Sequence, residues 1–213
     1  QRTGPTPEIG IVHIGPGAFF RAFNAVYTHE AMQQSGGDWG ILVVSLQSPT
    51  ARDQLAPQDG CYQAVTRGPD GDHPLQVAAI SQVLVAPEDP GAVVAAMADP
   101  AVRIVSLTIT EKGYRHVPAS GRLNMHDPDV QHDLSNPDTP KTAVGFLVAA
   151  LAARHAAGVA PFTVQSCDNL PDNGALARRI VLDFASAFDP ALADWIAAEA
   201  CFPSSMVDRI TPA

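Results

Sequence analysis

Two glycines near the start of the chain have the spacing of a phosphate-binding turn. Gly15 and Gly17 follow a short apolar run at residues 8–14, and a run with helical spacing begins at Ala18. The first glycine of such a turn permits a tight bend, and the second lets backbone amides approach a phosphate. Because Phe20 replaces the third glycine of the usual GxGxxG pattern, the turn alone leaves a dinucleotide site and a structural bend equally open.

Polar side chains follow three other apolar runs that are typical of buried strands. Gln47 follows the second run, Thr110 and Glu111 follow the third, and Asn169 follows the fourth. Ligands of open parallel sheets bind beyond the carboxyl ends of the strands, so these side chains are candidates for the lining of a binding site. The Asn169 amide could donate a hydrogen bond to a substrate oxygen, although an Asx turn explains this residue equally well.

Several residues in these segments also have ordinary structural interpretations. Glu111 and Lys112 are more often a surface ion pair worth under about 1 kcal/mol, and Asn173 is favoured as the cap of the next helix. An NAD site often has a carboxylate after its second strand. Here no acid occurs at that place before Asp53, and Arg52 is either a partner for a 2′-phosphate or, more often, a solvated charge. The choice between NAD and NADP therefore stays open.

The end of the chain and the histidines supply the remaining candidates. Asp208 and Arg209 lie between apolar residues, which is consistent with a strand-like segment beside a cleft. His116, His126 and His132 lie in a polar stretch, where solvated histidines are more common than metal ligands. The three cysteines lack zinc-ligand spacing, so we expect reduced thiols and no metal.

Hydrophobic patterns predict an α/β fold that positions these residues. Buried strands are expected at residues 8–14, 40–46, 103–109 and 162–166. Helices are expected at 18–34, 90–97, 173–188 and 190–200, with a further helix that Thr139 and Pro140 cap and that ends near residue 157. A turn at residues 68–71 predicts a hairpin between strands at 62–67 and 75–85, and residues 113–136 are expected to form a loop. This order predicts a doubly wound, mostly parallel, Rossmann-like sheet with a β-hairpin excursion, in one domain over residues 1–213.

Composition argues against several classes of partner. The formal charge of -9, with only 13 scattered Lys and Arg residues, disfavours nucleic acid, which requires a clustered basic face. No apolar run approaches the ~20 residues that span a bilayer, and no signal peptide precedes the first expected strand. We therefore expect no membrane association and a cytoplasmic location. The chain starts at Gln1 and stops without a closing helix, so we expect it to be a piece of a longer protein.

Five segments occur in the same order along this chain as in one family of enzymes. They read IVHIGPGAFFRAFNAVYT, SPTARDQLAPQDGCY, SLTITEKGY, SCDNLPDNG and SMVDRITP. Together they resemble the mannitol dehydrogenase family of long-chain polyol dehydrogenases, which includes mannitol 2-dehydrogenase, fructuronate reductase and tagaturonate reductase. The resemblance runs from about residue 8 to the end of the chain.

The resemblance implies metal-independent hydride transfer between a nicotinamide cofactor and the secondary alcohol of a polyol or aldonate. It implies that NAD, with NADP not excluded, contacts a set of residues at the strand ends: Gly15, Gly17, Ala18, Phe19, Arg21, Gln47, Thr110 and Glu111. It also implies that Asn169 and Asp208 face the substrate and the cofactor. Three departures from the family pattern are expected near the cofactor: Phe20 and Phe23 replace histidines, and Gln47 replaces an arginine.

The catalytic base of the family is expected to be missing. The resemblance implies a lysine base on a helix of a second, mostly helical domain, in a KxxxxNxxH pattern. The only lysines of this chain, Lys112 and Lys141, do not begin such a pattern. Because an alcohol needs a base to take its proton, we expect a catalytically incomplete chain that lacks the C-terminal helical domain of the family. The alternative is a dinucleotide-binding or redox-sensing module without catalysis.

Overall fold

A sheet of five parallel strands forms the middle layer of the molecule. The computed structural model describes residue 2, residues 4–207 and residues 210–211. The strands follow the order β5-β2-β1-β6-β9, and each neighbouring pair is parallel. They are β1 (Ile9–Ile14), β2 (Gly40–Ser45), β5 (Ile80–Val85), β6 (Ile104–Leu107) and β9 (Thr163–Ser166). This order, with β1 at the centre, confirms the prediction of a doubly wound α/β fold.

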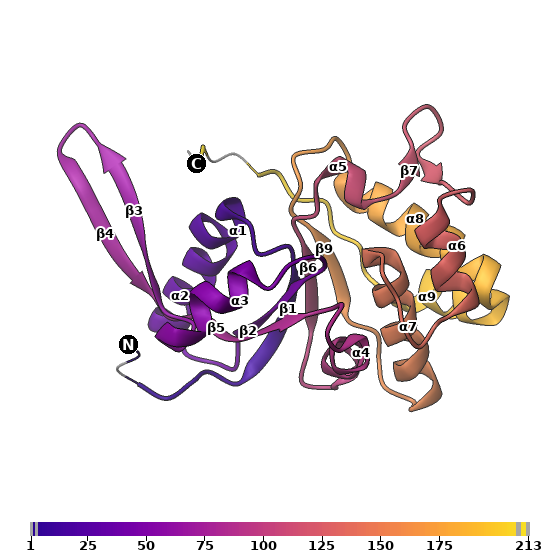
Figure 1. Cartoon of the computed structure of the whole chain (residues 1–213), viewed down its shortest axis with the longest axis horizontal. Coiled ribbons are helices and arrows are strands. Elements are labelled where there is room, and N and C mark those ends of the chain that lie inside the picture. The colour runs from indigo at the N-terminus through magenta and orange to yellow at the C-terminus, as the bar shows by residue number, and fades with distance from the viewer. Residues whose placement is uncertain (1, 3, 208–209, 212–213) are drawn as a thin grey trace.

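Helices cover both faces of this sheet (Figure 1). One face carries α1 (Ala18–Ala22), α2 (Asn24–Ser35) and α3 (Thr50–Leu55), which a short 3-10 turn (Ala56–Gln58) follows. The other face carries α4 (Pro90–Ala98), α7 (Ala143–Ala156), α8 (Asn173–Phe188) and α9 (Pro190–Glu199). The helices predicted to begin at residues 90, 173 and 190 are confirmed.

Alternate side chains of β2 are buried in two separate hydrophobic cores. Ile41 and Val43 belong to the core on the side of α1 and α2. Leu42 and Val44 belong to the larger core, which α4, α7 and α8 complete. Successive side chains of a strand point to opposite faces of the sheet. A strand that is apolar throughout must therefore be covered on both faces, which is what the sequence pattern predicted.

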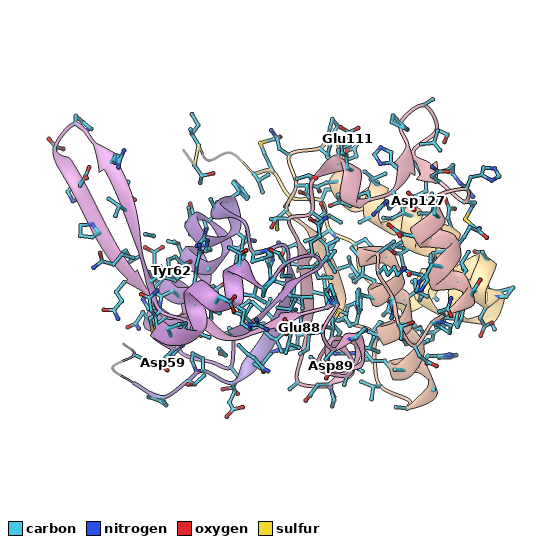
Figure 2. All side chains as sticks on the ribbon, viewed as in Figure 1. Asp59, Tyr62, Glu88, Asp89, Glu111 and Asp127 are labelled. Atoms are coloured by element: carbon cyan, nitrogen blue, oxygen red, sulfur yellow. The ribbon has the colours of Figure 1, made fainter. Side chains whose placement is uncertain are left out.

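The predicted hairpin is present, but the strand expected at residues 75–85 is two strands. β3 (Tyr62–Gly68) and β4 (Gly71–Val77) form an antiparallel ribbon, whereas β5 joins the parallel sheet. The ribbon projects from the body of the molecule (Figure 1), and most of its residues are exposed. Figure 2 shows Tyr62 at its base, where the Tyr62 hydroxyl donates a hydrogen bond to the Arg21 carbonyl. The boundary between β4 and β5 cannot be recognised in the sequence, because β4 ends and β5 begins with buried apolar residues.

The helix expected at residues 18–34 is interrupted at Phe23. This residue has φ -121° and ψ -84°, which are not helical values. Its ring stacks on Phe19, with 5.1 Å between the centroids, and meets Tyr27 edge-on at 5.0 Å. The helical spacing of apolar residues continues across the break, so the pattern does not reveal it. The end expected at residue 34 is close to the observed one: α2 ends at Ser35, before Gly36, which has φ +66°.

The stretch expected to be a loop, residues 113–136, contains regular structure. A small antiparallel ribbon pairs β7 (His116–Val117) with β8 (Arg122–Leu123), and α6 (Pro128–Ser135) follows. Asp127 caps α6 by accepting the amide N–H groups of Asp129 and Val130, and proline is tolerated in a first turn. The prediction of a loop is therefore wrong for α6, whose start signals were obscured by the polar composition around them.

Thr142 caps α7, so the prediction of a cap at Thr139 and Pro140 is wrong. The Thr142 hydroxyl oxygen accepts the Gly145 amide N–H at 3.0 Å. Asp133 of α6 fixes this start, because its carboxylate accepts the amide and the hydroxyl of Thr142 at 2.8 and 2.7 Å. The sequence offers two threonines that could cap the helix, and a contact from another helix selects between them.

A buried arginine joins several elements at the amino ends of β6 and β9. Arg154 is only 3% exposed, and its guanidinium donates hydrogen bonds to four backbone carbonyls. The acceptors are Met97 at 3.0 Å, Asp99 at 2.5 Å, Val102 at 2.6 Å and Ala160 at 2.9 Å. They lie at the end of α4 and in the loops that lead into the two strands. One side chain of α7 therefore joins the end of α4 to two loops.

The C-terminal segment runs without regular structure over residues 201–207, 210 and 211. The strand-like segment expected near Asp208 is therefore not found in the part of the chain that the structure describes, and Asp208 and Arg209 themselves lie outside it. Within the described residues, none of the helices has the length and hydropathy needed to cross a bilayer. Cys61, Cys167 and Cys201 are free thiols, as expected.

Candidate functional site

The turn after β1 requires glycine at its first position. Gly15 has φ +109°, and a Cβ at this position would lie 2.1 Å from the Thr108 carbonyl oxygen. Gly17 has extended angles, and a Cβ there would meet no atom within 4 Å. The fold therefore needs the first glycine, whereas the second leaves backbone open beside the start of α1.

A buried histidine holds this turn in place. His13 Nδ1 lies 2.8 Å from Ser106 Oγ, and Nε2 lies 3.0 Å from the Gly15 carbonyl oxygen and 2.9 Å from Thr108 Oγ1. Its ring stacks on Phe20 at 3.8 Å between centroids. Burial lowers the pKa of His13 from 6.5 to about 3, so the ring is neutral at neutral pH. His13 could not be recognised as a site residue from the sequence, because a histidine inside an apolar run forms no recognisable motif.

The buried, neutral His13 is expected to make the chain less stable in acid. Between pH 6.5 and about 3, the unfolded chain binds a proton at this ring and the folded chain does not. The stability that His13 contributes is therefore present above pH 6.5 and falls by up to about 1.4 kcal/mol per pH unit below it. Urea unfolding of His13→Gln is expected to show a weaker dependence on pH over this range than the unchanged chain shows. Parallel pH dependences of the two proteins would contradict a neutral buried ring.

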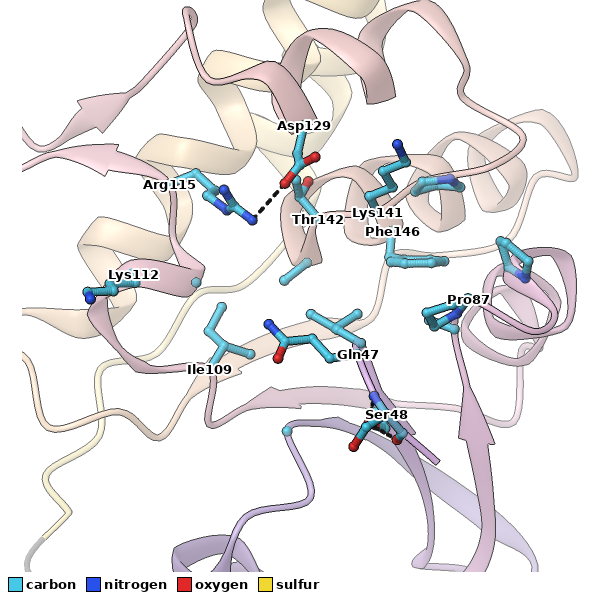
Figure 3. Close-up of a pocket in the computed structure, with 18 of the residues that line it drawn as sticks. Gln47, Ser48, Pro87, Ile109, Lys112, Arg115, Asp129, Lys141, Thr142 and Phe146 are labelled. Carbon is cyan, nitrogen blue, oxygen red and sulfur yellow. Dashed lines mark hydrogen bonds and ion pairs between the residues drawn. The ribbon is translucent and has the colours of Figure 1, made fainter. Parts of the chain in front are cut away.

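A cleft of about 1310 Å³ opens beside the glycine turn at the carboxyl ends of the strands. Residues that follow β1, β2, β5 and β6 line it, together with residues of α5 (Thr110–Gly113), α6 and α7. Figure 3 shows Gln47, Ser48 and Pro87 on one side of the cleft, with Thr142 and Phe146 across from them. A crevice at this place in a doubly wound sheet is where such folds bind ligands.

Positive side chains gather around the cleft although the chain as a whole carries a charge of -9. Lys112, Arg115 and Lys141 line it, and Asp129 is the one carboxylate among the described lining residues. Arg115 donates to Asp127 and to Asp129 at 2.9 Å each; Figure 3 shows the second of these contacts. Apart from Asp129, to which Arg115 donates, the described lining offers the two lysines no carboxylate. The local charge therefore favours an anionic ligand.

The carboxylate of Asp168 joins the end of β9 to the loop after β6. It accepts the amide N–H groups of Ile109 and Thr110 at 3.1 and 2.8 Å, and the Tyr114 hydroxyl at 2.7 Å. Burial and the charge of Asp168 raise the pKa of Tyr114, so this hydroxyl keeps its proton and donates. Thr110 has φ +62°, which is uncommon for a β-branched residue. Asp168 could not be recognised as an anchor from the sequence, because its contacts join residues far apart in the chain.

The structure brings some of the predicted cofactor residues to the cleft and leaves others beside it. Gly15, Gln47 and Thr110 are lining residues. The remaining predicted contacts lie outside the described lining, at the start of α1 or on α5: Gly17, Ala18, Phe19, Arg21 and Glu111. The cleft therefore contains a residue from each of the turns after β1, β2 and β6, as predicted from the strand-end argument.

Two side chains expected near a cofactor are placed elsewhere. Phe20 is buried beneath the turn, where it stacks on His13, so the sequence departure at this position affects packing under the turn and not the cleft lining. Glu111 is exposed on α5 (Figure 2), and its Oε1 lies 3.9 Å from His116 Nε2. Glu111 thus lies beside a residue of the small ribbon formed by β7 and β8.

Neither of the two predicted catalytic residues is among the described lining residues of the cleft. Asn169 is exposed and directly follows the buried Asp168, and Asp208 is outside the described residues. Asn173 does not cap α8, which corrects the prediction. Its side-chain amide donates to the carbonyls of Asp168 and Ser205 at 2.9 and 2.8 Å and accepts the Ser205 N–H at 3.0 Å. Asn173 thereby fastens the C-terminal segment beside the end of β9.

Arg52 is held by two carboxylates. One guanidinium nitrogen lies 2.9 Å from Asp53 Oδ1, and another contacts Glu88 Oε2. Glu88 follows Pro87, which lines the cleft. In agreement with the solvated charge favoured from the sequence, the Arg52 side chain is 33% exposed, and it lies in a small cluster with one excess negative charge.

Among the described residues, neither an activated thiol at Cys167 nor a metal-binding cluster is found. Burial raises the pKa of the Cys167 thiol, and the Asn24 amide donates to its sulfur at 3.1 Å. A buried, protonated thiol is a poor nucleophile. Across the described residues, no group of three or more His, Cys, Asp and Glu side chains is arranged to hold a metal ion.

Comparison with known proteins assigns this architecture to a family. Residues 9–213 match the family model described as the mannitol dehydrogenase Rossmann domain. The chain belongs to the mannitol dehydrogenase family. Mannitol 2-dehydrogenase of Aspergillus clavatus is 48% identical over the whole of this chain, and that of Cereibacter sphaeroides is 46% identical. The chain spans 43% and 45% of the lengths of these two relatives.

Solved structures of the family share this fold. Pseudomonas fluorescens mannitol 2-dehydrogenase, in a ternary complex with NAD and D-mannitol, has a TM-score of 0.93 and 46% identity, over 97% of this chain and 43% of that one. A D-sorbitol dehydrogenase in substrate-free form has a TM-score of 0.93 and 42% identity, over 98% of this chain and 44% of that one. The resemblance to the mannitol dehydrogenase family, and its Rossmann fold, are thus confirmed for a chain that covers less than half of these relatives.

Proposed function

We propose that this chain is the nicotinamide-binding domain of a dehydrogenase that interconverts a polyol or aldonate with its ketone. The observation that carries the proposal is the cleft beside the glycine turn, at the carboxyl ends of the strands, in a chain 46% identical to a structure that holds NAD and D-mannitol. NAD is the proposed cofactor. The domain extends over residues 1–213, as the N-terminal part of a longer two-domain enzyme.

The residues around the cleft fit a dinucleotide. A phosphate has room against the backbone at Gly17, because a Cβ there would meet no atom within 4 Å. Lys112 and Lys141 supply positive charge for the pyrophosphate, and the Gln47 amide after β2 can bind ribose hydroxyls. The nicotinamide, when bound, accepts or returns the hydride. The protein's part is to hold the cofactor and exclude water from the reacting carbon.

Asn169 and Asp208 are the residues that we propose to face the substrate. The Asn169 amide can donate to the oxygen of the alcohol or ketone, which stabilises charge that develops there. The alcohol proton must pass to a base, and neither Lys112 nor Lys141 begins the KxxxxNxxH pattern of the family. We therefore assign the base to the part of the longer protein that this chain does not cover.

The acidic cluster around Arg52 is expected to favour NADH over NADPH. The 2′-phosphate of NADPH would meet Asp53 and Glu88, which already neutralise the guanidinium. We expect NADH to bind at least about ten-fold more tightly than NADPH, which corresponds to roughly 1.4 kcal/mol. Glu88→Gln is expected to narrow this ratio by about three-fold, since it removes one carboxylate.

Fluorescence titrations with both cofactors measure this preference. Glu199→Gln removes an exposed carboxylate of α9 and is the matched control that keeps the ratio unchanged. Equal affinities of the unchanged chain for NADH and NADPH would show that the cluster does not face the ribose.

Titration of the 213-residue chain with NADH tests the proposed function directly. We expect saturable binding that NAD displaces, and no turnover of mannitol, mannonate or altronate by this chain alone. The longer protein is expected to reduce NAD with at least one of these substrates. Absence of NADH binding overturns the proposal, and binding without turnover by the longer protein favours a redox-sensing module instead.

A further inference from the structure

A left-handed residue lies in the cleft lining at the end of β6. Thr110 has φ +62° and is exposed toward the cleft that it lines. A β-branched side chain disfavours this conformation, so surrounding contacts must impose it. Residues in such rarely adopted backbone conformations cluster at functional sites, where the strain contributes to function.

The contact that imposes the conformation is the carboxylate of Asp168. Its two oxygens accept the amide N–H groups of Ile109 and Thr110 at 3.1 and 2.8 Å. The Tyr114 hydroxyl donates to the same carboxylate at 2.7 Å. Asp168 is only 8% exposed, so these hydrogen bonds are shielded from water. Two adjacent amides are thereby aimed at one buried group.

The same short segment supports the glycine turn. Thr108 Oγ1 donates to the Gly15 carbonyl oxygen at 2.8 Å, and the Thr108 carbonyl oxygen is 2.1 Å from the position that a Cβ of residue 15 would take. Residues 108–110 therefore contact the turn after β1 at one end and Asp168, after β9, at the other. Any change in how Asp168 holds Thr110 is transmitted to the backbone against which Gly15 packs.

We propose that Asp168 is a positioning residue for cofactor binding: it holds Thr110 in its left-handed conformation and thereby fixes residues 108–110 under the glycine turn. This inference rests on the proposed function of the cleft. Asp168 acts through the loop that it anchors. Its carboxylate is needed because both oxygens must accept an N–H, and the amide of an asparagine offers only one acceptor oxygen.

Asp168→Asn in the 213-residue chain tests this role. We expect NADH to bind at least about ten-fold more weakly, and the Thr110 amide to exchange its hydrogen faster than in the unchanged chain. Asp183→Asn is the matched control. Asp183 also has a mostly buried carboxylate that accepts a backbone N–H, from Leu123 at 3.0 Å, but it lies on α8 outside the cleft lining. This control is expected to lower stability without changing NADH affinity.

A second substitution separates positioning from general damage. Glycine adopts φ +62° without a side-chain penalty, so Thr110→Gly added to Asp168→Asn is expected to recover at least about three-fold in NADH affinity. If Asp168→Asn does not fold, Tyr114→Phe removes one donor to the same carboxylate and is expected to weaken NADH binding by about three-fold.

The outcomes distinguish this inference from the proposed function. If the unchanged chain does not bind NADH, the proposed function fails, and the exchange of the Thr110 amide still reports whether Asp168 holds the loop. If the unchanged chain binds NADH and Asp168→Asn binds it equally well, the positioning role is overturned. A loss of affinity that Thr110→Gly does not reduce also overturns it, because the conformation of Thr110 would then not be the cause.

Discussion

Replacing Gly15 with alanine is expected to destabilise the chain by about 3–5 kcal/mol and to abolish NADH binding. The new Cβ would lie 2.1 Å from the Thr108 carbonyl oxygen and 3.0 Å from Thr108 Oγ1, at φ +109°. Thr108 cannot move away freely, because Asp168 holds the residues that follow it. For a chain of this size, the loss corresponds to a fall of roughly 10 °C in Tm. Urea unfolding and NADH titration measure the two effects separately.

Two other glycines serve as controls for this substitution. Gly17→Ala places a methyl group in open space at ordinary backbone angles, so stability is expected to change by less than about 0.5 kcal/mol. NADH affinity is nevertheless expected to fall about ten-fold, because the methyl group occupies the place proposed for a phosphate. Gly36→Ala, at φ +66° with no neighbour within 4 Å, is expected to cost about 1 kcal/mol and leave affinity unchanged. Full NADH affinity in Gly17→Ala would show that the phosphates do not lie on this turn.

Replacing Arg154 with methionine is expected to destabilise the chain by about 3–5 kcal/mol while folded molecules keep their NADH affinity. Methionine retains most of the apolar volume but leaves the carbonyls of Met97, Asp99, Val102 and Ala160 without this donor. These carbonyls lie at the amino ends of the strands, whereas the cleft lies at the carboxyl ends. NADH affinity is therefore expected to be unchanged. The midpoint of urea unfolding, with the titration repeated below it, measures both quantities.

A surface arginine provides the comparison. Arg178 donates to the single carbonyl of Ala197 at 3.3 Å and is exposed, so Arg178→Met is expected to change stability by less than about 0.5 kcal/mol. Arg154→Lys is expected to recover less than half of the stability lost in Arg154→Met. An ammonium has fewer donors than a guanidinium and cannot reach all four carbonyl oxygens at once. Equal stabilities of the Arg154 and Arg178 variants would contradict the role given to the buried side chain.

The strands and most helices could be predicted from the sequence, because their buried faces are made of apolar residues at a recognisable spacing. β2 is apolar at nearly every position, and the caps of α4 and the glycine after α2 are local signals. The errors have a different physical origin. The break at Phe23 and the choice of Thr142 as the cap of α7 depend on contacts with other elements, which no local pattern contains.

The candidate site divides in the same way. Gly15, Gln47 and Thr110 could be predicted because the carboxyl ends of parallel strands meet at one edge. His13 and Asp168 could not, since their importance lies in hydrogen bonds to residues from other strands. A polar residue inside or directly after an apolar run is the one local signal that could have drawn attention to both of them. Which partner each finds becomes known only once the strand order is known.

The cleft contains both lysines of the sequence, Lys112 and Lys141. Apart from the N-terminal amine, their side chains are the only aliphatic amines in the chain, and both residues are exposed. The side-chain amines that a mild acylating reagent can modify therefore surround a single cavity. The mass that the chain gains on acylation, measured with and without a ligand, then reports whether the ligand covers that cavity. No label has to be introduced elsewhere in the protein.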